Sequence, residues 1–229
     1  MIIISLGGSL IAPKTANAAA RAEALHTYAN WLIKLSATQS VVAIVGGGYT
    51  ARVMMDEAKK TQPDISADDL DWIGIKATYD NAKHLQLECG TAVVQSDLIT
   101  NPAVTLTHDH GLVIGAGWKP GHSTDYDAVY LAAYNGVTTV YNLTNVPAVY
   151  NKDPKQFSDA QPVADMTWAQ LQQIVGTTWE PGLNMPFDPI AAQLAASKGI
   201  TVKLVDGSNL ANVNLALFNR PFQGTTIHL

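Results

Sequence analysis

The sequence predicts an α/β protein built on a mostly parallel, doubly wound sheet with helices on both faces. Short apolar runs alternate along the chain with segments of helical periodicity, which is the pattern of strand–helix–strand units. Successive positions within the runs are apolar, so both faces of the strands are expected to be buried. The length of 229 residues suits one large domain or two small ones.

Five segments are expected to be strands because each is a short run rich in apolar residues. They span residues 2–6, 41–45, 112–114, 138–141 and 201–205. The first two runs lead directly into glycines, at 7–8 and 46–48, and the third ends before Gly115. Strands that end in glycine and continue into a helix are usual at the carboxyl edge of such a sheet.

The helices are expected where apolar residues recur three or four positions apart. The three stripes are Ala22, Leu25, Ala29 and Leu32; Leu70, Ile73 and Ala77; and Ala128, Leu131 and Ala132. The polar segment 147–162 contains three prolines and is expected to form an extended hairpin or loop. This segment would begin a C-terminal lobe.

Composition and charge exclude several classes of protein. The net charge of −5 argues against a nucleic-acid-binding surface, which needs a basic face. No stretch approaches the roughly 20 apolar residues of a membrane span, and Cys89 alone cannot form an internal disulfide. The first residues are apolar without a basic lead, so we expect a cytoplasmic protein without nucleic-acid or membrane partners.

Two glycine-rich turns are candidate phosphate sites. The turns at 7–9 and 46–48 each separate an apolar strand from a helix, which directs free N–H groups and a positive helix end at one place. Arg52 lies one turn into the second helix, where its guanidinium can reach an anion bound at the helix start. The alternative is that the glycines serve only to turn the chain and that Arg52 is a solvated surface residue.

A third turn, at 115–125, precedes the helix expected from about residue 125. Thr124 and Asp127 are spaced as in a capping box, with Asp in place of Glu. Ser123, Thr124 and the first N–H groups of the helix could donate to a phosphate. The alternative is an ordinary capped helix start.

A polar and small stripe follows the helix expected from about residue 67. Its members are Asp71, Gly74, Thr78 and Asn81, at positions i, i+3, i+7 and i+10. The stripe suits a ribose and base, or equally a solvent-exposed face, and the spacing alone leaves both interpretations open.

The ordered set of motifs resembles uridylate kinase of the archaeal type, within the amino acid kinase superfamily. The motifs are GGS at 7–9, VGGGYTAR at 45–52, DWIGI at 71–75, PGHSTD at 120–125, TNV at 144–146, Tyr150 with DP at 153–154, FDPIAA at 187–192 and GTTI at 224–227. The resemblance extends from the first expected strand to the end of the chain.

This resemblance implies transfer of a phosphoryl group from MgATP to UMP by a single three-layer αβα sandwich over residues 1–229. It implies an acceptor-binding lobe over about 1–140, a nucleotide-binding lobe over about 141–229, and a homohexamer. By position, the ATP-binding residues would be Gly8, Ser9, Gly48, Arg52, Thr144, Asn145, Tyr150 and Asp153. The UMP-binding residues would be Gly47, Asp71, Trp118, Lys119, Pro120, Gly121, His122, Ser123 and Thr124. Arg52 and Asp188 would be the catalytic residues, and no side chain is assigned as a metal ligand.

The chain departs from the pattern of these relatives at three places. Ser5 stands where many superfamily members carry Lys, although archaeal-type relatives also lack it. Pro147 and Ala148 replace the usual Asp and Gly, and Tyr79 replaces an Arg. Proline removes an N–H and restricts φ, so the nucleotide-side loop is expected to differ. Two alternatives stay open: another small-molecule kinase of the superfamily, and a nucleotide- or oxyanion-binding protein without turnover.

Overall fold

Seven strands form one central sheet in the computed structural model, which describes residues 1–229 except 15–16, 91–93, 95–96, 108–110 and 183–184. The strand order is β3-β2-β1-β4-β8-β9-β7. The strands are β1 (Ile2–Leu6), β2 (Ser40–Val45), β3 (Gly111–Gly115), β4 (Thr139–Thr144), β7 (Asp165–Thr167), β8 (Thr201–Asp206) and β9 (Thr225–His228). The first five in spatial order are parallel, and β9 and β7 run against them.

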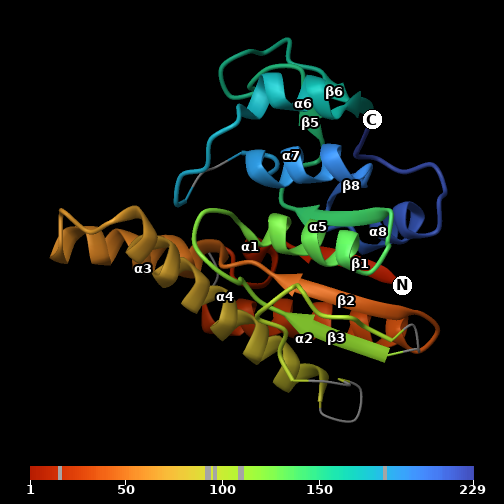
Figure 1. Ribbon diagram of the computed structural model, residues 1–229. Helices are drawn as coiled ribbons and strands as arrows, with labels where there is room; N and C mark the ends of the chain where they lie inside the picture. The colour runs from red at the N-terminus through yellow and green to blue at the C-terminus, as the bar shows by residue number, and fades with distance from the viewer. Residues whose placement is uncertain (15–16, 91–93, 95–96, 108–110, 183–184) are drawn as a thin grey trace.

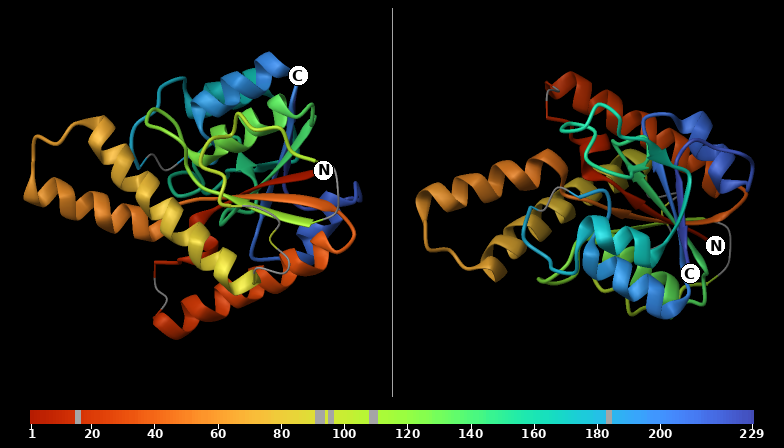
Figure 2. Two further views of the ribbon diagram at one scale, coloured as in Figure 1. Left: turned by 60° about the horizontal axis from the view of Figure 1, so that its bottom comes forward. Right: turned by 90° about the horizontal axis from the view of Figure 1, so that it is seen from above.

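Eight helices are assigned within the described residues. They are α1 (Gly8–Ile11), α2 (Ala18–Ser36), α3 (Gly48–Thr61), α4 (Ala67–Cys89), α5 (Thr124–Tyr134), α6 (Trp168–Val175), α7 (Pro189–Lys198) and α8 (Leu210–Leu217). Helices α2 and α8 cover one face of the sheet and α5 and α7 cover the other (Figure 2). The fold is therefore the expected three-layer sandwich with a mostly parallel sheet. None of these helices is both long and apolar enough to cross a membrane.

The central strand β1 shows why both faces are covered. Ile2, Ile4 and Leu6 pack into the core beneath α2 and α8, whereas Ile3 packs into the core beneath α5 and α7. Side chains alternate between the two faces of a strand, so a run apolar at every position requires two helical layers.

The expected elements are present, with two differences. All five expected strands are confirmed. Segment 147–162 contains β5 (Val149–Tyr150) and the first residue of β6 (Pro162–Val163), which pair as a small antiparallel hairpin. In the first helical stripe, Ala22 is exposed, because the N-terminal part of α2 extends past the sheet; Ala29 and Leu32 are buried as expected. The short strand β7 and helices α6 and α8 carry too few periods to be recognised from the sequence.

The two glycine turns touch each other at the carboxyl edge of the sheet. A Cβ atom on Gly8 would lie 2.2 Å from the Gly46 carbonyl oxygen, and one on Gly48 would lie 2.3 Å from the Gly8 carbonyl carbon. Gly48 also has φ of +58°, which side chains disfavour. Gly8 and Gly48 are therefore required because the backbones of the turns that follow β1 and β2 are in direct contact.

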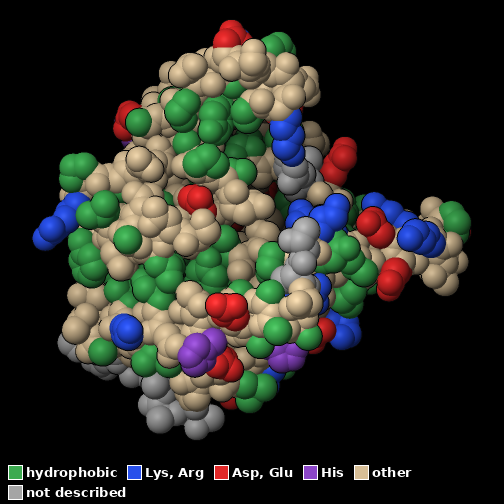
Figure 3. Space-filling model, turned by 180° about the vertical axis from the view of Figure 1, so that it is seen from behind, with side chains coloured by type: hydrophobic (Ala, Val, Ile, Leu, Met, Phe, Trp, Pro, Cys, Tyr) green, Lys and Arg blue, Asp and Glu red, His purple; other side chains and the backbone are tan. Residues whose placement is uncertain are grey.

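Helices α3 and α4 form an arm that projects from the body beyond these turns (Figure 1). A small apolar cluster joins them, made of Ala51 and Met55 from α3 with Leu70 and Ala77 from α4. Positive and negative side chains are interspersed over the arm on the face drawn in Figure 3. The packing of α3 on α4 fixes the polar stripe of α4 beside the glycine turn of β2.

Candidate active site

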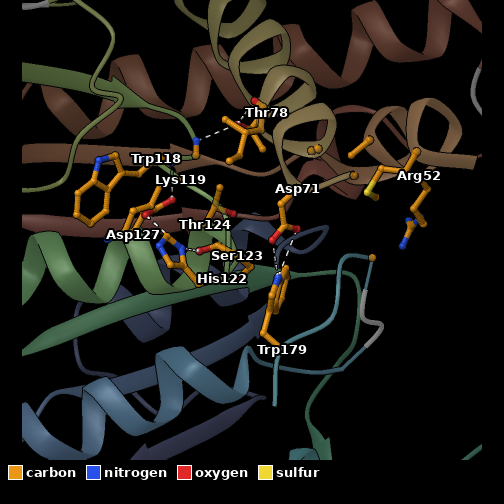
Figure 4. A pocket seen from close by; sticks show the side chains of 18 residues that line it. Arg52, Asp71, Thr78, Trp118, Lys119, His122, Ser123, Thr124, Asp127 and Trp179 are labelled. Carbon is orange, nitrogen blue, oxygen red and sulfur yellow. Dashed lines mark hydrogen bonds and ion pairs between the residues drawn. The ribbon is translucent and has the colours of Figure 1, made fainter. Parts of the chain in front are cut away.

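A cavity lies between the base of the arm, the β3–α5 loop and the α6–α7 loop (Figure 4). It is lined by Gly47, Gly48, Ala51, Arg52, Met55, Asp71, Gly74, Ile75, Thr78, Gly117, Trp118, Lys119, His122, Ser123, Thr124, Asp127, Trp179 and Gly182. Seven of the nine residues expected to bind UMP are among them; Pro120 and Gly121 are in the same loop but not in the lining. The acceptor residues expected from separate motifs therefore meet at one place.

The polar stripe of α4 faces the site rather than solvent. Asp71, Thr78 and Asn81 are buried. The Asn81 side-chain amide donates to the carbonyl oxygens of Gly46 and Gly47, at 2.9 and 3.0 Å, and so holds the glycine turn. The Thr78 hydroxyl accepts from the Gly117 N–H at 2.8 Å. Asp71, Gly74 and Thr78 line the cavity, while Asn81 supports the turn, and ligand binding by the stripe stays a prediction.

The β3–α5 loop is held by three carboxylates that accept from its backbone. The bonds are Trp118 N to Asp127 Oδ2 (3.2 Å), Gly121 N to Asp71 Oδ2 (2.8 Å) and Ser123 N to Asp188 Oδ2 (2.6 Å). The loop is therefore held in place by α4, α5 and α7 before any ligand arrives.

The cap of α5 differs from the expectation. The N-cap residue is Ser123, whose hydroxyl accepts from the Asp125 N–H at 3.1 Å, so the Thr124–Asp127 capping box is wrong by one residue. The N–H of Ser123 is also occupied, by Asp188, and is not free for a phosphate. Thr124 is instead the first helical residue, and its hydroxyl faces the cavity beside Gly46.

Asp188 is the N-cap of α7 and is almost fully buried. Its Oδ1 accepts from the N–H groups of Ile190 and Ala191, at 2.7 and 3.2 Å, while Oδ2 holds Ser123. Asp188 does not line the cavity. In this arrangement its carboxylate connects the start of α7 to the β3–α5 loop, called the acceptor loop because the UMP-binding residues are expected there.

His122 and Asp127 form a poorly satisfied polar pair at the wall of the cavity. Asp127 Oδ1 accepts no hydrogen bond and lies 3.6 Å from His122 Nδ1, and His122 Nε2 also has no partner among the described residues. Burial lowers the pKa of His122 and raises the pKa of Asp127 well above its ordinary value. Both shifts oppose charge, because removing water destabilises the ionised forms. The His122 ring stacks on Tyr126 at 4.1 Å between centroids.

Two cationic side chains line the same cavity. Arg52 projects from the first turns of α3, and its side chain is exposed. Lys119 lies in the acceptor loop, with its ammonium 4.2 Å from the centre of the Trp118 ring. Carboxylates hold the loop backbone, so these two cations are the groups positioned to offset the charge of an anionic ligand.

The residues expected around the adenosine lie apart from this cavity. Thr144 ends β4, Asn145 follows it, and Tyr150 and Asp153 belong to the hairpin region. None of the four lines the cavity, and neither do Gly8 and Ser9. The Asp153 carboxylate accepts from the Lys155 N–H and the Gln156 amide, both within its own loop. These assignments remain predictions.

Ser5 belongs to a buried polar group at the centre of the sheet edge. Asp125 Oδ1 accepts from the Ser5 hydroxyl at 2.7 Å and from the Asn142 amide at 2.6 Å. Burial raises the pKa of Asp125 to about 6, although the bond from Ser5 acts in the opposite direction. With Ser5 in place of a lysine, no cation in this group stabilises the carboxylate.

Replacing Asp125 with Asn should therefore change how stability depends on pH. The raised pKa means that the folded protein binds more protons than the unfolded chain between about pH 4 and 6, so wild-type stability falls as pH rises through that window. Asn keeps an oxygen that accepts from Ser5 and Asn142. We expect Asp125→Asn to raise Tm at pH 8 by several degrees, corresponding to about 1–3 kcal/mol, with no difference near pH 3.

Thermal unfolding followed by circular dichroism from pH 3 to pH 8 measures this difference. Asp64→Asn is the control: Asp64 is exposed, and its substitution should change Tm little at any pH in this range. An Asp125→Asn effect of equal size at every pH would contradict the titration and leave only a packing effect.

Trp179 is the main site residue that the sequence did not indicate. Its indole N–H donates to Asp71, at 3.0 Å to Oδ2 and 3.4 Å to Oδ1. It lies in the irregular α6–α7 loop, 108 positions from its partner. No motif or periodicity marks it, so only the folded chain reveals this contact.

Known proteins with similar sequences cover the whole chain. Residues 1–206 match the amino acid kinase family. The chain is 31% identical over 221 residues to a uridylate kinase of Methanothrix thermoacetophila, covering 95% of each. It is 30% identical over 223 residues to one of Methanocaldococcus jannaschii, covering 95% of this chain and 96% of the relative.

A solved structure agrees with these matches. The crystal structure of uridylate kinase from Archaeoglobus fulgidus superposes with a TM-score of 0.79 at 26% identity, and the match covers 99% of each chain. The family match, the relatives and the arrangement of the glycine turns at the sheet edge agree. This chain belongs to the amino acid kinase family.

Proposed function

We propose that this protein transfers the γ-phosphoryl group of ATP to UMP and releases UDP and ADP. The observation that carries the proposal is the cavity in which Asp71, Arg52 and the glycine turn of β2 meet. A ribose needs a hydrogen-bond acceptor, and phosphates need cations and free N–H groups. Both kinds of group line this one cavity, and relatives named uridylate kinases match 95% of the chain.

The acceptor nucleotide would lie against α4 and the β3–α5 loop. Asp71 would accept from the ribose hydroxyls, and its burial makes that hydrogen bond strong. Lys119 and Thr124 would face the phosphate of UMP, since the N–H groups of Trp118, Gly121 and Ser123 are already bonded to carboxylates. The glycine turn at Gly47 would face the transferred group.

The donor nucleotide would lie over the carboxyl ends of β1, β4 and β8. The first N–H groups of α3, at Gly48 and beyond, have no carbonyl partner within the helix and suit the ATP phosphates. Gly8 and Ser9 would border the same phosphates, and Thr144, Asn145, Tyr150 and Asp153 would surround the adenosine. Mg²⁺ bound with ATP supplies charge neutralisation of the phosphates.

The chemistry needs positioning and charge more than acid–base groups. A phosphate oxygen of UMP forms a bond to the γ-phosphorus while the bond from that phosphorus to the ADP oxygen breaks. The attacking oxygen is already anionic, so no general base is required. Arg52 would offset charge on the transferred group, and Asp188 would hold the acceptor loop by way of Ser123.

Coupled ADP release by the wild-type protein tests the proposal, with UMP, CMP, dUMP and candidate amino acids as acceptors. UMP is expected to give the highest kcat/KM. A binding protein without turnover is the second candidate, because Pro147 and Ala148 alter the nucleotide-side loop. Binding of UMP in calorimetry without ADP release above background would favour that candidate. Release with an amino acid but not with UMP would favour another kinase of the family.

Replacing Asp71 with Asn should weaken use of UMP. The substitution keeps the shape of the side chain but removes the charge, and losing a charge-assisted hydrogen bond costs about 1.5–3 kcal/mol. We expect KM for UMP to rise at least tenfold, measured in the ADP-release assay. Asp80→Asn on the exposed side of the same helix is the control. Unchanged kcat and KM for UMP would remove Asp71 from the acceptor site.

We also propose that the chain forms a homohexamer in the cytoplasm and serves pyrimidine nucleotide synthesis. Exposed apolar side chains on α4, namely Trp72, Tyr79 and Leu87, support a subunit contact there. Light scattering after gel filtration should give about six times the 24.4 kDa chain mass. A mass of one or two chains would contradict the hexamer and leave the proposed reaction unaffected.

A further inference from the structure

Trp179 connects the α6–α7 loop to α4 at the wall of the cavity. It lies in the α6–α7 loop, and its indole points at Asp71 on α4 (Figure 4). The distance from Nε1 to Asp71 Oδ2 is 3.0 Å. Gly182 of the same loop also lines the cavity beside Met55 of α3. Trp179 and Gly182 therefore form part of the cavity wall.

The two donors on Asp71 share one of its oxygens. Oδ2 accepts from the Gly121 N–H at 2.8 Å and from the Trp179 N–H at 3.0 Å. Oδ1 has only the 3.4 Å approach of the same indole nitrogen among the described residues, which is too long for a strong bond. A carboxylate has about four lone-pair sites, so Oδ1 keeps its acceptor capacity.

The bonds also fix the rotation of the carboxylate. Its plane could turn freely about χ2 on a solvated Asp, because that torsion is broad. Here the two donors come from different loops, one before α5 and one before α7. Turning the carboxylate would break at least one of these two hydrogen bonds, so the orientation that leaves Oδ1 available is held.

We propose that Trp179 is a positioning residue that determines discrimination between ribose and deoxyribose in the acceptor. Its N–H and that of Gly121 occupy Oδ2 of Asp71 and present Oδ1 to the 2′-hydroxyl of the ribose. The inference rests on the proposed use of a ribonucleotide acceptor by Asp71. It adds that selectivity against the 2′-deoxy acceptor depends on a tryptophan that itself need not touch the sugar.

Kinetics of Trp179→Phe with UMP and dUMP test this role. Phe keeps an aromatic ring in the loop but has no N–H. We expect KM for UMP to rise about tenfold and KM for dUMP to rise less than about twofold, so that discrimination falls by about fivefold or more. The kcat for UMP should change little, since Trp179 acts on acceptor binding.

Trp31→Phe is the matched control. It removes an indole N–H that donates to Asn214 at 3.0 Å, between α2 and α8 and outside the cavity lining, and should leave the UMP-to-dUMP ratio unchanged. Trp179→Gln, which keeps an N–H donor without the ring, should retain more discrimination than Trp179→Phe. This variant also tests the inference if the Phe variant proves unstable.

A double-mutant cycle with Asp71→Asn shows whether Trp179 acts through Asp71. In the Asp71→Asn background, adding Trp179→Phe should cost less than half of what it costs in the wild type, because residues in one hydrogen-bond network are not additive. Equal increases of KM for UMP and dUMP, no increase for either, or full additivity would each overturn the inference while UMP phosphorylation stands. Absence of both UMP binding and UMP phosphorylation would overturn the proposed function, and the inference with it.

Discussion

Replacing Arg52 with alanine should lower kcat for phosphorylation of UMP by about 10² or more. Removing one preorganised group that stabilises transition-state charge typically costs about 10²–10³ in rate. Arg52 lines the cavity beside Gly48, where α3 begins, and its side chain is exposed. Because it buries little surface, the substitution should leave Tm within about one degree of wild type.

Arg52→Lys separates charge from geometry. Lysine keeps the positive charge but loses the two-pronged donor, so it should recover only part of the rate. Arg220→Ala is the matched control, as Arg220 is also exposed but remote from the cavity. The assay is ADP release at saturating UMP and MgATP, alongside thermal unfolding. Normal turnover combined with a lower Tm would contradict a catalytic role and leave Arg52 as an ordinary surface residue.

Replacing Gly48 with alanine should distort the backbone at this turn, lower the stability of the protein and lower the rate of phosphorylation. The new Cβ would lie 2.3 Å from the carbonyl carbon of Gly8, so one of the two turns must move. The φ of +58° adds about 1–2 kcal/mol of strain for a residue with a side chain. With the displaced backbone, we expect a loss of at least about 3 kcal/mol in stability.

The loss of activity should exceed the loss of stability. Displacing the start of α3 moves Arg52 and the N–H groups expected to face phosphate, and shifts of about 1 Å can cost about 10² in rate. Gly136→Ala is the matched control: its φ is +67°, but a Cβ there meets nothing within 4 Å. It should cost only the strain and leave kcat unchanged. Equal effects of the two substitutions would show that contact between the turns is unimportant.

The polar stripe on α4 shows how much periodicity alone can predict. The spacing of Asp71, Gly74 and Thr78 places them on one side of a helix whatever the rest of the chain does. Whether that side meets solvent or a cavity depends on the β3–α5 loop and Trp179, which donate hydrogen bonds to Thr78 and Asp71. The burial of Asp71 and Thr78 is decided by these long-range contacts and was left open by the sequence.

The cap of α5 shows a limit of local patterns. Ser123, Thr124 and Asp127 allow more than one N-cap, and the sequence favoured Thr124. The folded protein selects Ser123, whose N–H donates to Asp188, the N-cap residue of α7, 65 positions later. That bond anchors the chain one residue before Thr124 and leaves the Thr124 hydroxyl to face the cavity.

The alternation of apolar runs with helical stripes by itself determined the layered parallel sheet, and the glycines after the first two strands determined where that sheet would carry its site. Both are local signals, since side-chain periodicity and backbone freedom act over a few residues. Only the tertiary structure decided that Trp179 donates to Asp71, and that Asp71, Asp127 and Asp188 hold the acceptor loop. Contacts between segments far apart in sequence depend on how helices and loops pack around the sheet, and no spacing along the chain encodes that geometry.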